Sequence, residues 1–242
     1  MTVERNEIDS KAYGHPVLAI SDFDPALDFD AFEQAYLAQH PSAYVACKVP
    51  MEELAAIHKL EAAGFRLVEC QIRSELSIRK PHPVEAFPYD FVRVETEQDL
   101  EPVLAIAART FVHDRFGIDP LVPAGVSGQR YRDYVSKSFH AADEAVYHLI
   151  DRQTGRTVAF KTHRYLSATE ALLLLGGVDP ECKGVGLGAI NSYFEYNEFH
   201  RLGIKKVTTH VSASNYPILV LEISKLGYRV TQAFAVLRKI YR

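Results

Sequence analysis

A run of apolar residues followed by a glycine-rich turn with one lysine is the part of this sequence best suited to chemistry. The run is Leu172–Val178, the turn holds Lys183, Gly186 and Gly188, and a helix-like segment follows as far as Gly203. A strand, a glycine turn and a helix in this order place backbone N–H groups and a helix N-terminus where an anion such as a phosphate binds. The stretch therefore predicts a site for a phosphate-bearing ligand.

Two common phosphate-binding patterns do not fit this turn. The P-loop needs Gly-x-x-x-x-Gly-Lys-Ser/Thr, a string that the sequence lacks. The dinucleotide fingerprint needs Gly-x-Gly-x-x-Gly, but Gly184, Gly186 and Gly188 place the third glycine one residue early. The pattern that remains is Lys183-x-x-Gly186-x-Gly188, a cation followed at fixed spacing by two glycines.

Length and composition limit the class of protein. The 242 residues allow one large domain or two small ones, and the net charge of −4 argues against a nucleic-acid or anionic-membrane binder. No apolar run approaches the roughly 20 residues that span a bilayer, and the charged N-terminus does not resemble a signal peptide, so we expect a cytoplasmic protein. The three cysteines form no Cys-x-x-Cys pair, so neither a disulfide framework nor a metal site is predicted.

The elements that position the turn follow from hydrophobic periodicity. A stripe of Leu100, Val103, Leu104, Ala107 and Phe111 marks an amphipathic helix. The expected strands are 91–95, 144–151, 157–165, 170–178, 206–211 and 228–241, and the expected helices are 97–111, 129–140, 189–202 and 214–225. Their order, β-α-α-β-β-β-α-β-α-β, predicts a mixed sheet with helices on its faces.

A proline-rich segment divides the chain. Residues 80–88 contain three prolines, which break helices and strands, so we place a domain boundary between 1–87 and 88–242. An internal repeat relates the two parts: Gly64 and Gly227 lie 163 positions apart, and the same offset superposes the strand, helix and helix exit before each of them. The first part therefore looks like a truncated copy of the C-terminal half of the second.

The glycine turn resembles motif A of the GNAT superfamily of acyl-CoA-dependent N-acyltransferases. That motif is Arg/Gln-x-x-Gly-x-Gly/Ala, and Lys183 stands here where an Arg or Gln is usual. Asn215 opens a helix that ends in the string LGYR at residues 226–229, similar to the Asn-x-x-Ala…Leu-Gly-Phe-Arg segment of the family. The resemblance covers about residues 90–242. It implies the α/β (α+β) GNAT fold, a mixed and mostly antiparallel sheet flanked by helices, preceded here by a smaller, degenerate half-GNAT domain.

The resemblance also implies a co-substrate, acetyl-CoA or another acyl-CoA, and no metal. In GNAT proteins the strand equivalent to 174–178 diverges from its neighbour, so its free backbone groups pair with pantetheine. The implied coenzyme-binding residues are Leu175, Gly176 and Val178 for pantetheine, Lys183, Gly184, Val185, Gly186, Leu187 and Gly188 for the pyrophosphate, and Asn215.

A narrower resemblance concerns the acceptor. A degenerate half-domain ahead of a complete one is similar to the dTDP-fucosamine acetyltransferase type, which acylates an amino group on a nucleotide-linked deoxysugar in surface-polysaccharide biosynthesis. The loop 110–116 looks like the Arg-Phe segment of those enzymes. By that likeness His113, Asp114 and Arg115 would recognise the acceptor, since a diphosphate needs a guanidinium partner. The alternative is a solvated loop with local Asp–Arg pairing.

The catalytic groups are less well defined by the sequence. In the family a tyrosine seven residues after the Asn commonly protonates the leaving thiolate, but here that position is Glu222, in a segment one residue longer than usual. Glu222 could serve if burial raised its pKa, and the alternative is an exposed carboxylate. Tyr228 and Tyr216 are the other candidate acids, although Tyr228 could equally be a core residue. His210 and His163 are candidate bases or structural histidines.

The function predicted from these features is transfer of an acetyl or related acyl group to a primary amine, above all that of a nucleotide-linked amino sugar. Acylation of a protein, peptide or antibiotic amine, and a non-catalytic acyl-CoA-binding module, remain alternatives. The helix 189–202 carries aromatic residues on more than one face, and these would pack against the first part of the chain or a second subunit, so we expect a homodimer.

Overall fold

The computed structural model describes residues 1–26, 28–37, 43–111, 114–182, 184 and 186–241. Over these residues one sheet of ten strands runs through the chain in the order β1-β2-β3-β10-β4-β9-β8-β7-β6-β5. The strands are β1 (Thr2–Arg5), β2 (Val17–Ser21), β3 (Ala43–Pro50), β4 (Arg66–Ser77), β5 (Tyr89–Arg93), β6 (Glu144–Asp151), β7 (Thr157–Tyr165), β8 (Glu170–Val178), β9 (Lys206–Ser212) and β10 (Arg229–Tyr241). Two neighbouring pairs in this described sheet are parallel, β2–β3 and β8–β9, and the others are antiparallel, so the expected mixed sheet is confirmed.

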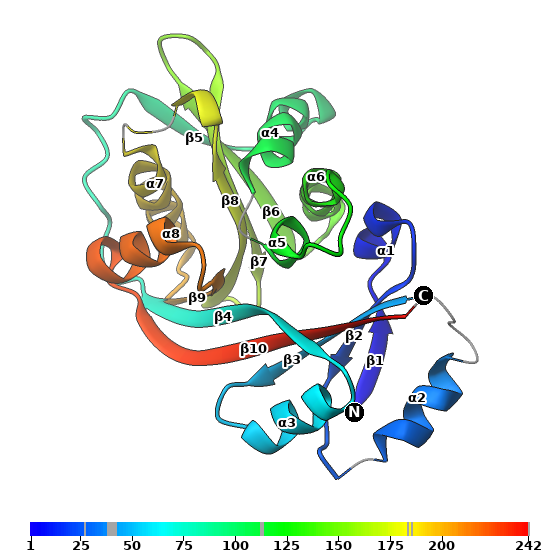
Figure 1. The fold of residues 1–242 in the computed structure, drawn as a ribbon. Helices are drawn as coiled ribbons and strands as arrows, with labels where there is room; N and C mark the ends of the chain where they lie inside the picture. Colours follow the sequence, from blue (N-terminus) through cyan, green and yellow to red (C-terminus); the bar gives the residue numbers. More distant parts are fainter. Residues whose placement is uncertain (27, 38–42, 112–113, 183, 185, 242) are drawn as a thin grey trace.

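Helices cover both faces of the sheet. They are α1 (Glu7–Tyr13), α2 (Phe29–Leu37), α3 (Leu54–Ala62), α4 (Glu97–Thr110), α5 (Arg115–Ile118), α6 (Val126–His140), α7 (Leu187–Leu202) and α8 (Tyr216–Leu221). In Figure 1, α4, α5 and α6 lie on one side of β6–β8, and α7 and α8 lie on the other. The predicted order of the second half is confirmed, with the short helix α5 as an addition.

The amphipathic stripe of α4 faces the sheet as its period requires. Thr96 caps the helix by accepting a hydrogen bond from the Asp99 amide at 3.2 Å. Leu100, Val103 and Ala107 are buried against β6, β7 and α6. Burial of this stripe fixes the end of α4 beside β8, where the loop to α5 begins.

The repeat of 163 positions appears in the sheet as an approximate two-fold arrangement. The offset carries β3 onto β9, α3 onto α8 with its following turn, and β4 onto β10. Each half exchanges its last strand with the other: β4 pairs with β9, and β10 pairs with β3, while β4 and β10 pair with each other. The register agrees, since Cys70 pairs with Ala235 and Ile72 with Ala233. The sheet is thus continuous across the proline-rich segment, and the two-domain division stays a prediction.

Candidate functional site

The parallel strands β8 and β9 diverge after a short contact. They pair from Glu170 with Lys206 to Leu172 with Thr208, and the described pairing stops there although β8 continues to Val178. The far edge of β8 remains paired with β7, and the far edge of β9 with β4. The backbone edges that face each other across the gap therefore lack strand partners, as the resemblance implied.

A cavity of about 480 Å³ occupies this gap and continues on both faces of the sheet. Its walls include residues 173–178 of β8, residues 209–212 of β9, the loop and helices before α6 on one face, and α7 and α8 on the other. Leu174 lies at a register shift of β8, because Thr162 pairs with Leu175 whereas His163 pairs with Leu173. The predicted pantetheine contacts Leu175, Gly176 and Val178 all line the cavity.

The glycine turn leads directly into α7. Gly184 and Gly186 have φ angles of 94° and 77°, a conformation that glycine adopts without strain, and Gly186 is the N-cap of α7. Because Gly186 has no side chain, it cannot accept a capping hydrogen bond from the first backbone N–H groups of the helix, those of Leu187 and Gly188. Lys183 and Val185 lie outside the described residues. The described part of the turn therefore presents backbone donors at a helix N-terminus, which suits a phosphate.

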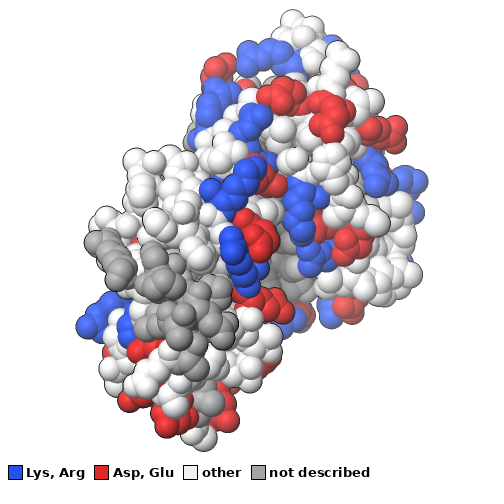
Figure 2. Space-filling view, turned by 90° about the vertical axis from the view of Figure 1, so that its right-hand side faces the viewer, with Lys and Arg blue, Asp and Glu red and all other residues white. Residues whose placement is uncertain are grey.

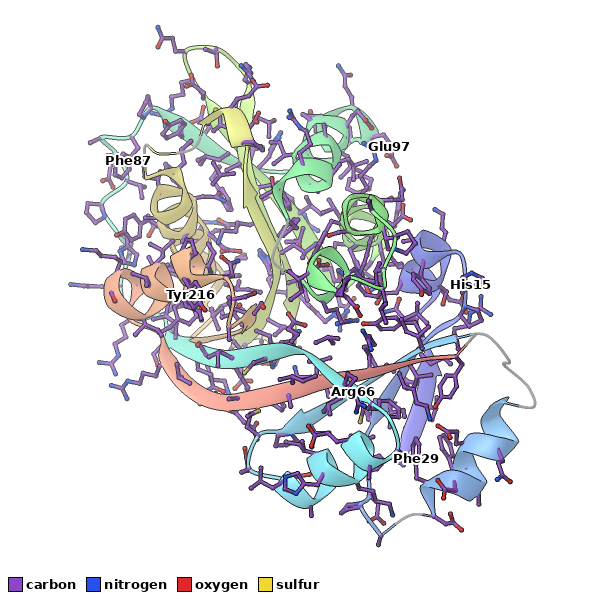
Figure 3. The ribbon with its side chains drawn as sticks, viewed as in Figure 1. His15, Phe29, Arg66, Phe87, Glu97 and Tyr216 are labelled. Atoms are coloured by element: carbon purple, nitrogen blue, oxygen red, sulfur yellow. The ribbon has the colours of Figure 1, made fainter. Side chains whose placement is uncertain are left out.

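The start of α8 forms the opposite rim of the cavity. Asn215 precedes the helix, lines the cavity, and makes no capping hydrogen bond with its side chain. Tyr216, which was a candidate acid, is 72% exposed at the start of α8 (Figure 3). Of these two neighbours, Asn215 is the one placed on the cavity wall.

Glu222 is buried, so the alternative of an exposed carboxylate is wrong. It is 7% exposed, lines the cavity, and its Oε2 has no hydrogen-bond partner among the described residues. Burial raises the pKa of this carboxyl to about 7, while Lys161 lowers it and Glu195 raises it further. Glu222 opens a single π-helical turn, Glu222–Leu226, and such a turn accommodates one residue more than an α-helix. The π-helical turn therefore accommodates the extra residue of the segment that follows Asn215.

Tyr228 is a core residue. It is 3% exposed, packs with the residues beneath α7, and accepts a hydrogen bond from the Tyr196 hydroxyl at 2.9 Å. Burial, the first cause, and the neighbouring Tyr196 raise the pKa of Tyr228 well above its usual value. Tyr196, but not Tyr228, is among the described residues that line the cavity.

The two candidate histidines lie in different surroundings. His210 lines the cavity, and partial burial together with Lys48 and Arg73 lowers its pKa to about 4, so the ring is neutral at pH 7. His163 is fully buried beneath α7, 3.3 Å from Glu195 and 3.0 Å from the Tyr165 hydroxyl. His210 therefore lies on the cavity wall, whereas His163 belongs to a buried network behind that wall.

The predicted acceptor residues lie at the other face of the sheet. Asp114 caps α5, accepting from the Gly117 amide at 2.7 Å, and binds Arg130 at 2.8 Å. Arg115 donates to Asp9 of α1 at 3.1 Å. Both line the cavity, and their pairing is long-range rather than local, so the alternative of a locally paired, solvated loop is wrong. His113 lies outside the described residues.

Two charged residues on the α7 side of the sheet, Lys161 on the cavity wall and Glu195 behind it, could not be identified from the sequence. Lys161 of β7 donates to Ser192 at 3.0 Å and lies 3.1 Å from Glu195, a fully buried residue of α7. Burial alone would raise the pKa of Glu195, but Lys161 and His163 outweigh it and hold the pKa below its usual value. The available signal was a lysine directly after the apolar residues 158–160 of β7 and a glutamate among the aromatics of α7, whose partners only the fold reveals.

Two further polar residues of the cavity, Glu69 and Gln71, come from β4 of the N-terminal half. Nothing in the residues around them indicates that β4 lies between β9 and β10. No group of His, Cys, Asp and Glu suited to a metal is found in the described part of the chain. Within the same residues no helix is both long and apolar enough to cross a membrane.

Comparison with solved structures identifies the fold. A GCN5-related N-acetyltransferase from Sphaerobacter thermophilus has a TM-score of 0.69 and 13% identity, covering 99% of this chain and 76% of its own. A tandem GNAT protein from the clavulanic acid biosynthesis pathway has a TM-score of 0.61 and 13% identity, covering 95% of this chain and 76% of its own. A GCN5-related glucosamine N-acetyltransferase region of a fungal multi-domain β-N-acetylglucosaminidase has a TM-score of 0.64 and 14% identity, covering 93% of this chain and 30% of that one.

No protein-family model and no curated protein sequence matches the chain. At identities this low, structural likeness establishes the fold alone. With its diverging parallel strands, glycine turn and long following helix, the chain has the fold of the GNAT N-acetyltransferases.

Proposed function

We propose that this protein is an N-acyltransferase that moves an acetyl or related acyl group from coenzyme A to a primary amine. The observation that carries the proposal is the cavity between β8 and β9, which reaches the start of α7 on one face and charged residues of β4 and α5 on the other. It offers an open strand edge, a helix N-terminus and a buried acid in one continuous space.

The cavity fits the chemistry of coenzyme A. Pantetheine carries amides that can pair with a free strand edge, here Leu175, Gly176 and Val178. The amides that follow Gly186 suit the pyrophosphate, and Asn215 faces the same space. On the face in Figure 2, Lys and Arg lie interspersed with Asp and Glu, so local donors rather than a broad positive surface would hold the anion. When bound, the coenzyme supplies an acyl thioester.

The residues around the gap supply proton transfer. A carboxyl with a pKa of about 7 is protonated in a large fraction of molecules at neutral pH, so Glu222 can donate a proton to a leaving thiolate. Lys161 and Ser192 form the wall beside it. A buried acid in the cavity, whose Oε2 has no hydrogen-bond partner in the described part of the chain, favours catalysis over a role in coenzyme binding alone.

For the acceptor we propose the amino group of a nucleotide-linked deoxy amino sugar. Two observations support this choice: guanidinium groups of Arg115 and Arg130 line the acceptor side of the cavity, where they could meet a diphosphate, and one structural neighbour is a glucosamine N-acetyltransferase region. Both arginines also pair with Asp9, so the diphosphate would share them with that carboxylate.

The test is to incubate the protein with acetyl-CoA, longer acyl-CoAs and a panel of amines while following free thiol. The panel contains a nucleotide-linked amino sugar, glucosamine, cadaverine and a lysine peptide. We expect stabilisation by coenzyme A in thermal unfolding and fastest thiol release with the amino sugars. Fastest release with the peptide would replace the proposed acceptor, and stabilisation without turnover on any amine would indicate a binding module. Absence of stabilisation would contradict the proposal.

A further inference from the structure

A buried glutamate of the N-terminal half lies in the cavity on the side away from α7. Glu69 of β4 is 7% exposed and lines the cavity together with Gln71 two residues on. Its Oε2 accepts a hydrogen bond from the side-chain Nε2 of Gln71 at 3.0 Å, and the Ser212 side chain also hydrogen-bonds to the carboxylate. Burying a carboxylate costs free energy unless a cation or several donors accompany it, and the two side chains that hydrogen-bond to Glu69, Gln71 and Ser212, are both uncharged.

The neighbouring cations do not supply a charged partner within salt-bridge distance. Arg115 lies close enough to favour ionisation of Glu69, but its guanidinium binds Asp9 at 3.1 Å. Lys48 of β3 lies over the Phe234 ring, 4.3 Å from its centroid. Among the described residues, none forms an ion pair with Glu69.

The other charged groups around this space are mostly engaged with one another. Asp114, which disfavours ionisation of Glu69, is bound to Arg130. Arg73 on the same strand pairs with Glu75 at 2.9 Å, and His210 beside it is neutral at pH 7. Burial, opposed mainly by Arg115, raises the pKa of Glu69 above its usual value. A raised pKa makes its carboxylate a stronger base than a solvent-exposed one.

The two buried acids of the cavity lie on opposite faces of the sheet. Glu222 sits on the side of α7 and α8, close to Lys161 and Glu195, whereas Glu69 faces α5 and Arg115. The gap between β8 and β9 joins the two sides within one cavity. A thioester that reaches through the gap from the α7 side would therefore meet an acceptor held on the Glu69 side.

We propose that Glu69 binds the protonated amine of the acceptor and removes its proton before acyl transfer. The inference rests on the proposed function. The ammonium gives one proton to the Glu69 carboxylate, and the nitrogen lone pair then forms the bond to the thioester carbon. The C–S bond breaks with its electron pair on sulfur, which takes the proton of Glu222, while the nitrogen releases its second proton to water. Glu69 then loses its proton to water, and Glu222 regains one, so the net products are amide, thiol and one proton.

The proposal makes the N-terminal half a part of the acceptor site. β4 enters the sheet between β9 and β10 through the exchange of strands, so Glu69 and Gln71 line the cavity from the side of β9 that is away from β8. The predicted acceptor presents a primary amine that is charged in solution.

The experiment compares Glu69→Gln with wild type, using the panel amine that gives the highest kcat/KM. Because general-base catalysis contributes about 100-fold or more, kcat/KM for the amine should fall at least 100-fold in the variant. The Kd for coenzyme A should stay within about twofold. Wild-type kcat/KM should fall at low pH as Glu69 protonates, and Glu69→Gln should lose this limb. Thermal stabilisation by glucosamine in the presence of coenzyme A should also be lost, whereas stabilisation by N-acetylglucosamine, which has no ammonium, should not change.

Two further variants separate chemistry from structure. Glu69→Asp keeps the charge and should retain the low-pH limb with reduced activity. Glu75→Gln, on the same strand but outside the described cavity wall, should leave kcat/KM unchanged.

Activity of Glu69→Gln within threefold of wild type would overturn the inference. So would the loss of coenzyme binding in both Glu69 variants, which would indicate a structural role. Wild-type protein that binds coenzyme A but neither binds nor acylates any amine would also overturn it. A wild type that coenzyme A does not stabilise would instead contradict the proposed function.

Discussion

At the scale of single residues, the site combines buried charges whose partners come from distant parts of the chain. Lys161 lies 3.1 Å from Glu195, which is fully buried, and interacts with Glu222, whose Oε2 has no hydrogen-bond partner among the residues that the structure describes. The same lysine thus lowers the pKa of Glu195 below its usual value and interacts with Glu222, whose pKa burial raises to about 7. This arrangement lets one acid stay charged while its neighbour holds a proton.

We predict that Glu222→Gln lowers kcat about 100-fold or more, because an amide cannot donate the proton that the thiolate needs. Wild-type kcat should fall as pH rises through about 7, since the protonated form of Glu222 is lost there. The measurement is kcat against pH under saturating acyl-CoA and amine. An unchanged high-pH limb in Glu222→Gln would contradict this role.

Glu222 also affects stability in a direction that its raised pKa determines. The unfolded chain ionises this group near its ordinary pKa of 4.5, and the folded protein only near 7, so its contribution to stability is complete below 4.5 and is lost as pH rises through 7. The loss is at most about 3 kcal/mol. Urea unfolding at pH 5 and pH 8 should show Glu222→Gln gaining stability relative to wild type at the higher pH. An equal difference at both pH values would contradict the buried, titrating carboxyl.

Replacing Lys161 should lower the free energy of unfolding, because Glu195 is buried beside it. Lys161→Met leaves Glu195 without its closest cation, and breaking a buried pair from one side costs about 3 kcal/mol or more in the free energy of unfolding. Lys206, paired with Glu170 at 2.9 Å on the surface, is the matched control, and Lys206→Met should cost less than about 1 kcal/mol. Urea denaturation measures both, and equal losses would show that Lys161 has no special role.

At the scale of elements, the site depends on how α7 begins and how β8 and β9 separate. Gly186 and Gly203 lie at the two ends of α7, with φ angles of 77° and 82° and open space where a Cβ would stand. Both ends therefore have the same backbone requirement, but only the first faces the proposed pyrophosphate.

We expect Gly186→Ala and Gly203→Ala to destabilise the protein by a similar amount, about 1–2 kcal/mol each. Only Gly186→Ala should also weaken coenzyme A binding, because strain there shifts the amides that follow it. Calorimetric titration with coenzyme A, together with unfolding of both variants, checks this. If both glycine variants bound coenzyme A as tightly as wild type, the start of α7 would not be the phosphate site.

Periodicity predicted the elements well because it depends on local burial. The stripe of α4 and the hydrophobic run of β8 are set by short-range patterns, and both lie where the sequence indicated. Glu69, Lys161 and Glu195 could not be assigned in the same way. Strand exchange and helix docking place Glu69 and Lys161 on the cavity wall and Glu195 in the buried layer behind it, and the sequence does not state which distant charge will lie beside which.

At the scale of the whole molecule, the exchange of β4 and β10 joins the two halves. Each of these strands is hydrogen-bonded on both edges to strands of the other half, so the halves cannot separate without breaking the sheet. The aromatics of α7 that suggested a second subunit are partly covered within the chain: Tyr193 stacks on His82 at 4.5 Å, and Phe194 on Phe91 at 6.3 Å. The homodimer stays a prediction.

The exchanged strands predict a single cooperative unfolding unit. Amides of β3 in the N-terminal half and β9 in the C-terminal half should exchange with the same free energy, that of global unfolding. Native-state hydrogen exchange against denaturant measures this directly. A distinctly lower free energy for β3 would show that the N-terminal half opens independently.

The most direct test of the account is a crystal structure of the protein with coenzyme A. We predict pantetheine in the gap between β8 and β9, paired with residues 175–178, and the pyrophosphate on the amides of Leu187 and Gly188 with Lys183 and Asn215 beside it. Coenzyme bound elsewhere on the molecule, or a gap between β8 and β9 that stays free of pantetheine, would contradict it.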